Sequence, residues 1–136
     1  MSVIQVRPAT LRDAKAIAEI HVAASQDAYK ALLAQWQTDV NALVDADRPP
    51  AIFSYQTSAG YVRDSNHLSI SRAQLEAAQE FDNWYLVAPT YPYTDKGGHL
   101  DPNGSRWLGM QFGKVMHQVL DLGRGWMPLH PIRATT

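Results

Sequence analysis

Short runs of β-branched and aromatic residues occur at three places along this chain, and each run lies next to a proline. Such runs are typical of buried strands, because branched and aromatic side chains pack well on a pleated surface. They predict strands over residues 3–7, 51–55 and 84–88. The segments between these runs are long enough to hold helices.

Apolar residues three and four positions apart mark the segments between and after the predicted strands. This spacing puts them on one face of an α-helix and predicts helices over 11–45, over 69–81 and from residue 102 onward. The first segment carries two apolar stripes, so it forms either one bent helix or two helices. We expect the break at 23–25. Residues 122–136 show no periodicity and are expected to form an irregular tail.

Residues with side-chain oxygen atoms stand where each predicted helix begins. An oxygen at this position accepts hydrogen bonds from the free N–H groups of the first helical turn, and an acidic or amide residue three positions later completes a capping box. The start signals are Thr10 with Asp13, Ser71 with Gln74, and Asp101 followed by Pro102.

Helical segments separate the predicted strands, which is typical of parallel strands joined by helical crossovers. The sequence therefore predicts one domain over 1–136, an α/β fold with a partial three-layer arrangement and a parallel sheet of about three strands. So few strands would leave a sheet edge and apolar faces uncovered. We therefore expect a homo-oligomer, or a partner chain that covers the open edge.

The composition is that of a globular protein, with 46% hydrophobic and 18% charged residues. The formal net charge is −1, so bulk electrostatics favour neither nucleic acid nor an anionic membrane as a partner. No apolar run approaches the roughly 20 residues that span a bilayer. Charged residues also interrupt the first 15 positions, so a signal peptide is not expected and a cytoplasmic location is the default expectation.

The chain has no cysteine, which excludes disulfides and thiolate chemistry. Four of its histidines, at positions 21, 67, 117 and 130, stand in segments that favour structural or solvent-exposed roles. No histidines and carboxylates stand at ligand spacing along one helix. We therefore expect neither a metal nor a cofactor.

The segment from Tyr93 to Gly109 resembles the histidine block of SGNH/GDSL-type hydrolases, in which an aspartate precedes a histidine and a helix start. Residues 54–58, 70–79 and 84–93 resemble neighbouring strands and a helix of the sialate O-acetylesterase-like and phage-type members. The resemblance covers about residues 24–133. It implies a flavodoxin-like, SGNH-type fold and hydrolysis of a carboxylic ester or a carbohydrate O-acetyl ester.

The same resemblance implies roles for five residues. His99 would take the proton from a serine hydroxyl, while Asp95 would orient its imidazole. Gln56, Tyr91 and Tyr93 would bind the substrate. His99 precedes a predicted helix and follows a strand, where ligands gather in open parallel sheets.

Two departures from the family pattern limit the expected activity. Three residues stand between Asp95 and His99 where the family has two. The family's Gly-Asp-Ser nucleophile block and its oxyanion-hole residues are not visible in the sequence. Ser58 follows a predicted strand and is the one substitute nucleophile we consider, although it lacks the family's flanking residues. A chain without nucleophile and oxyanion donors is expected to be inactive by itself.

Residues 6–24 resemble the first strand and helix of GNAT N-acetyltransferases, without the glycine-rich turn that binds the acetyl-CoA pyrophosphate in that family. The two resemblances meet near 23–25, which suggests a fusion, a rearranged reading frame or a chimera. Three hypotheses for the function follow. They are an ester-hydrolase fragment, a non-enzymatic assembly module and an acetyltransferase-like fragment.

Overall fold

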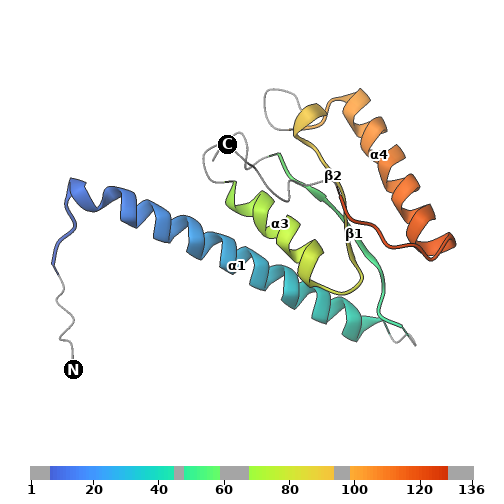
Figure 1. Cartoon of the computed structure of the whole chain (residues 1–136), viewed down its shortest axis with the longest axis horizontal. Helices are drawn as coiled ribbons and strands as arrows, with labels where there is room; N and C mark the ends of the chain where they lie inside the picture. Colours follow the sequence, from blue (N-terminus) through green and yellow to red (C-terminus); the bar gives the residue numbers. More distant parts are fainter. Residues whose placement is uncertain (1–6, 45–47, 59–67, 94–98, 129–136) are drawn as a thin grey trace, which may run out of the picture.

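Two parallel strands lie between helices in this chain, and one long helix extends beyond them (Figure 1). The structure, a computed structural model, describes residues 7–44, 48–58, 68–93 and 99–128. In chain order its longer elements are α1 (Ala14–Leu43), β1 (Ile52–Gln56), α3 (Ser69–Glu80), β2 (Trp84–Pro89) and α4 (Pro102–Met116). Shorter elements are 3-10 turns at Leu11–Asp13 and Tyr91–Tyr93 and a π-helical turn at His117–Asp121.

The two strands form a parallel sheet with α3 as the crossover between them. Ile52 pairs with Trp84 and Ser54 with Leu86, and the register shifts between Ser54 and Gln56. This confirms the expected α/β arrangement. The described residues hold two strands rather than about three, because the predicted strand over 3–7 lies outside them except for Arg7, which is not in a strand.

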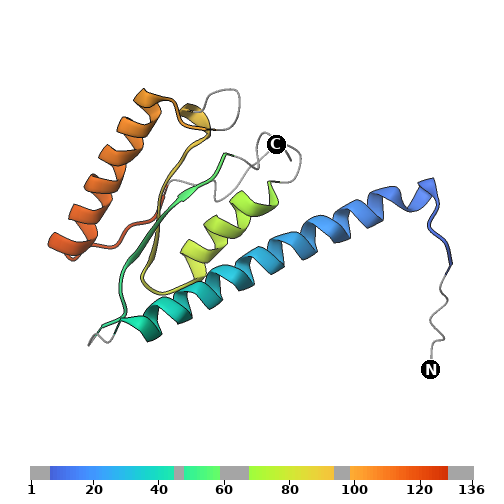
Figure 2. The ribbon, with the colours of Figure 1, turned by 180° about the vertical axis from the view of Figure 1, so that it is seen from behind.

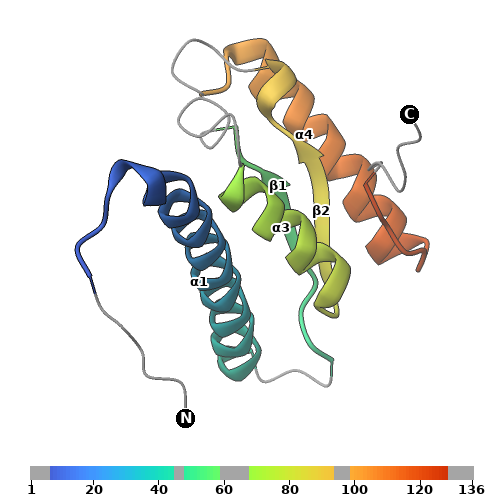
Figure 3. The same cartoon turned by 60° about the vertical axis from the view of Figure 1, so that its left-hand side comes forward.

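Helices cover both faces of the sheet (Figure 3). On one face, α3 and α1 pack over a buried cluster of Ile52, Ala77 and Trp84. On the other face, α4 contributes Leu108 and Val115 to a second buried cluster. Leu108, Phe112 and Val115 stand four and three positions apart, as predicted for one face of this helix, and all three pack in this cluster.

The first helix is continuous, and its N-terminal half extends away from the sheet (Figures 1 and 2). The break expected at 23–25 is absent. Ala23 and Ala24 favour helix, and no glycine or proline stands between Ala14 and Leu43. Ser25 lies within the helix, where its hydroxyl donates to the carbonyl oxygen of His21 at 2.8 Å.

From Gln26 onward, α1 binds α3 through polar and apolar side chains. Gln26 Nε2 donates to Glu76 Oε1 at 2.7 Å, and Lys30 Nζ lies 2.5 Å from Glu80 Oε2. The hydrogen bond with Glu80 raises the pKa of Lys30. Leu33 adds apolar contact with the cluster of Ile52, Ala77 and Trp84, and the ring of Trp36 meets that of Trp84 in β2 edge-on with 5.5 Å between centroids.

At the predicted start signal, the acidic residue Asp13 binds the backbone of Thr10. The backbone N–H of Thr10 donates to Asp13 Oδ2 at 2.8 Å, and the helix begins with a 3-10 turn. Arg7 binds the same carboxylate at 2.7 Å. This bond is the main reason that the pKa of Asp13 lies below its ordinary value, and the Thr10 N–H adds to it.

The second predicted capping pair does not cap a helix. The helix α3 begins at Ser69, after Leu68 in a left-handed conformation with φ 51°. Ser71 and Gln74 therefore lie inside the helix, and their side chains bind Thr57 at the end of β1 instead.

The predicted cap of α4 is confirmed. Asp101 Oδ1 accepts from the N–H of Gly104 at 2.6 Å, with Pro102 at the first helical position. Gly104 packs against the turn after β2, so closely that a Cβ atom there would lie 2.5 Å from the carbonyl oxygen of Tyr93. Beyond α4 the chain returns to the sheet, where Trp126 Nε1 donates to the carbonyl oxygen of Leu86 at 2.9 Å.

We expect Gly104→Ala to lower the free energy of unfolding by about 1–3 kcal/mol, because the new methyl group overlaps backbone that cannot move freely. Gly113→Ala is the matched control on the same helix, where a Cβ atom would meet nothing within 4 Å. The control is expected to raise stability by up to about 1 kcal/mol, through helix propensity. Urea denaturation of both variants measures this, and an equal gain from both would contradict the close packing of Gly104.

Candidate functional site

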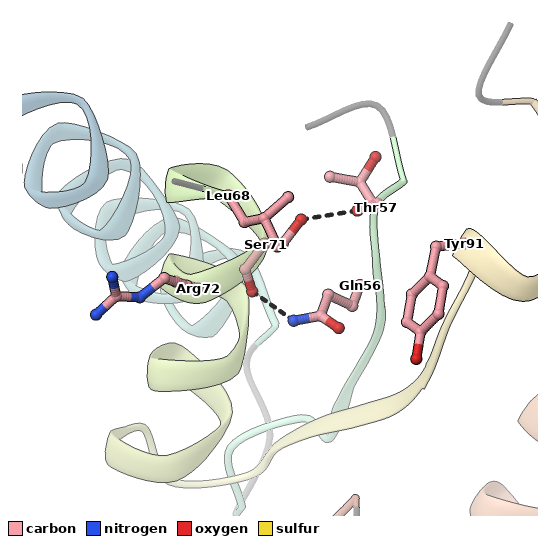
Figure 4. A pocket seen from close by; sticks show the side chains of 6 residues that line it. All are labelled: Gln56, Thr57, Leu68, Ser71, Arg72 and Tyr91. Carbon is pink, nitrogen blue, oxygen red and sulfur yellow. Dashed lines mark hydrogen bonds between the residues drawn. The ribbon is translucent and has the colours of Figure 1, made fainter. Parts of the chain in front are cut away.

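A cavity of about 300 Å³ opens beside the carboxyl end of β1 (Figure 4). This volume is at the lower end of the roughly 300–1,000 Å³ usual for small-ligand pockets. The described residues that line it are Gln56, Thr57, Leu68, Ser71, Arg72 and Tyr91. They come from the end of β1, the first turn of α3 and the turn after β2, so three separate segments meet at this edge of the sheet.

Side chains of α3 hold the end of β1 in place. The hydroxyl of Ser71 donates to the carbonyl oxygen of Thr57 at 2.8 Å, and Gln74 Oε1 accepts from the Thr57 N–H at 2.8 Å. In the reverse direction, Gln56 Nε2 donates to the carbonyl oxygen of Ser71 at 2.8 Å. The two bonds to Thr57 satisfy backbone groups just beyond the last paired residue of the sheet. Together the three bonds hold the end of β1 against α3 beside the cavity.

Thr90 joins the end of β2 to the end of β1 by hydrogen bonds. Its backbone N–H and its hydroxyl each donate to the carbonyl oxygen of Gln56 at 3.0 Å, and Thr90 is 3% exposed. Tyr91 follows directly and begins a 3-10 turn. The position of Tyr91 beside the cavity therefore depends on the hydrogen bonds of a buried neighbour.

The lining combines polar groups with apolar carbon surface from Leu68 and Tyr91, and Arg72 is the charged residue among the described lining residues. Figure 4 shows the amide oxygen of Gln56 turned toward Tyr91, while Arg72 points away from the space between them. Tyr91 is 57% exposed, so its ring offers a flat surface to a ligand. The described lining holds amide, hydroxyl and phenol groups and no carboxylate. Such a set suits a neutral or anionic polar ligand.

The structure brings together two of the three residues predicted to bind substrate, Gln56 and Tyr91. Tyr93 is not among the described lining residues. Its ring stacks on that of Trp107, with 4.0 Å between centroids, and so joins the turn after β2 to α4.

The residues predicted to act in catalysis are not gathered in the described part of the cavity. Ser58 is 1% exposed, directly after the lining residue Thr57. His99 is exposed and lies three residues before the first residue of α4, outside the described lining. Asp95 lies outside the described residues. The predicted pairing of Asp95 with His99 therefore stays a prediction.

Four lining residues were not predicted from the sequence. Thr57, Leu68 and Arg72 carry no local signal that distinguishes them from other loop and helix residues. Ser71 did carry a signal, but its spacing from Gln74 indicated a helix start. What distinguishes these residues is their contact across the β1–α3 connection, which pattern alone does not show.

Among the residues that the structure describes, no three histidine or acidic side chains lie close enough together to hold a metal ion. The same residues contain no helix with the length and apolar character needed to cross a membrane. Comparisons with family models, with curated proteins and with solved structures found no match for this chain. The functional assignment therefore depends on the site itself.

We expect Gln74→Met to remove the Gln74 acceptor from the N–H of Thr57 and to lower the free energy of unfolding by about 1–2 kcal/mol, because a half-buried amide loses this hydrogen bond. Hydrogen exchange at Thr57 should become faster than in the unaltered chain. The matched control is Gln79→Met, an exposed position on the same helix, with an expected effect within about 0.5 kcal/mol. Unchanged exchange at Thr57 would show that this bond does not hold the strand end.

Proposed function

We propose that this chain is the substrate-binding and histidine-bearing half of an SGNH-type ester hydrolase. The observation that carries the proposal is the position of the cavity. It lies at the carboxyl end of a parallel strand, which is where open α/β sheets bind their ligands. The resemblance of residues 93–109 to the SGNH histidine block supports the same function.

The proposed substrate is a small polar ester, such as an O-acetylated sugar. Gln56 Nε2 already donates to Ser71, so the Oε1 atom of Gln56 is the one that would accept a hydrogen bond from a sugar hydroxyl. The ring of Tyr91 would lie against the flat face of the sugar. The absence of carboxylates from the described lining suits a ligand that is neutral or carries its own carboxylate.

The proposed catalytic role of His99 is that of a general base, and it needs a serine that the substrate can reach. Ser58 is 1% exposed, so a substrate cannot approach its hydroxyl without a change in the chain around it. We infer that the nucleophile and the oxyanion donors come from another polypeptide. Because those groups supply most of the rate enhancement in acyl transfer, this chain alone should be nearly inactive.

Hydrolysis of p-nitrophenyl acetate tests the catalytic part of the proposal. The unaltered chain, His99→Ala and His67→Ala are all expected to hydrolyse the ester at the slow rate of free imidazole. Serine-directed fluorophosphonate should leave all three unlabelled. A large loss of rate confined to His99→Ala would contradict the proposal, because it would show that this chain contains a working nucleophile.

Ligand binding tests the cavity separately. Ligand-observed NMR should detect 6-O-acetylglucose more strongly than glucose, and Tyr91→Ala should weaken binding about tenfold, which corresponds to about 1.4 kcal/mol. Met110→Ala is the control, because Met110 is 66% exposed on α4 and lies outside the described lining. Equal binding to Tyr91→Ala and Met110→Ala would place the ligand elsewhere.

An assembly module is the second candidate function, and one observation favours it. The helix α1 exposes large apolar side chains beside its packed face, among them Leu32 at 62% and Leu43 at 84%. Exposed apolar residues that lie together mark interaction surfaces. An assembly module without a ligand site would bind neither 6-O-acetylglucose nor glucose, which separates it from the first candidate.

A further inference from the structure

The outer edge of β1 has no neighbouring strand among the described residues. Ile52 and Gln56 both bond to the β2 side, since the N–H of Ile52 donates to Asn83 and the carbonyl of Gln56 accepts from Thr90. Backbone groups in a strand alternate in direction, so the N–H and C=O groups of Phe53 and Tyr55 point the other way. Among the described residues these groups have no backbone partner, and they form a short row of donors and acceptors.

The opposite edge of the sheet is protected. The carbonyl oxygen of Leu86, which points away from β1 by the same alternation, accepts a hydrogen bond from Trp126 Nε1 at 2.9 Å. The returning tail thus lies along β2 and contacts the cluster under α4. An incoming strand would therefore meet β1 and not β2.

Side chains at the open edge differ on the two faces of the sheet. Phe53 lies on the α4 face, where its ring stacks on Tyr85 with 5.3 Å between centroids, and Tyr55 alternates to the same face with 46% of its surface exposed. Ser54 lies on the opposite face, where its hydroxyl accepts from Trp84 Nε1 at 2.8 Å.

We propose that two copies of this chain pair antiparallel through β1, with the two-fold axis at Ser54. In this register Phe53 of each copy lies opposite Tyr55 of the other, and each such pair exchanges two backbone hydrogen bonds. The aromatic side chains then continue the stack that Phe53 already makes with Tyr85. A two-stranded sheet becomes a four-stranded one, β2–β1–β1–β2, with helices on both faces.

A second copy fits this edge because the edge is self-complementary. A two-fold axis requires that the donors of one copy meet acceptors of the other in the same way in both directions. At Phe53-Ser54-Tyr55 the N–H and C=O of Phe53 meet the C=O and N–H of Tyr55 of the other copy, with an aromatic residue on each side of the axis.

Single cysteines test the register, since the chain has none of its own. Residues that face each other at a non-hydrogen-bonded antiparallel position lie about 4.5 Å apart at Cα, within the range of about 4.4–6.8 Å for a disulfide. Ser54→Cys is therefore expected to form a covalent dimer under mild oxidation. Tyr55→Cys is the matched control and should not, although Tyr55 is the more exposed of the two positions. Cross-linking at 55 and not at 54 would overturn the proposal.

Analytical ultracentrifugation of the unaltered chain gives a second, independent measurement. We expect a concentration-dependent dimer, and a rise of at least tenfold in its dissociation constant for Tyr55→Pro, which removes an edge N–H. Tyr55→Thr keeps that N–H and should weaken the dimer less. Circular dichroism checks that each variant folds. A monomer at all concentrations, or a dimer unaffected by Tyr55→Pro, would overturn the proposal whatever the outcome of the ester and sugar experiments.

Discussion

The indole of Trp84 joins the elements on which the rest of the described structure depends. It is 4% exposed, its Nε1 donates to Ser54 of the neighbouring strand, and its ring meets Trp36 of α1 and Phe81 at the end of α3 edge-on. A buried Trp N–H needs an acceptor, and Ser54 supplies one without opening the sheet. One side chain therefore sets the register of the two strands and places both helices above them.

The site is a consequence of that arrangement at the other end of the strands. Once β1 and α3 lie side by side, the backbone of Thr57 leaves the sheet and needs new partners, which Ser71 and Gln74 provide. The same hydrogen bonds hold the strand end against the helix, and the cavity lies beside them. The amide and hydroxyl groups of its lining include those that satisfy these backbone groups.

The two proposals concern different parts of the described α/β structure. A cavity at the strand ends suits a small ligand, while the open edge of β1 suits another strand. Pairing through β1 would extend the sheet at its edge and leave the carboxyl ends of the strands accessible. Binding and self-association can therefore coexist in one molecule, and the serine that His99 would need is a separate requirement.

The sequence by itself determined the local elements. The strands at 52–56 and 84–89 and the helix at 69–80 lie within two residues of their predicted limits, and Asp101 caps α4 as its pattern indicates. These features depend on near neighbours in the chain, so local spacing is enough to predict them. The continuity of α1 could have been predicted from its alanines, but the change of apolar stripe near 23–25 suggested a break.

Only the tertiary structure decided how Ser71 and Gln74 are used and where Ser58 lies. Ser71 and Gln74 bind Thr57, a residue 14 and 17 positions away, and a distant partner has no trace in local periodicity. Gln56 and Tyr91 meet at one cavity because parallel strands end at the same edge of a sheet, and Ser58, directly after the lining residue Thr57, is buried. The sequence contains the residues of the site, whereas their partners and exposure come from contacts between segments that are distant in the chain.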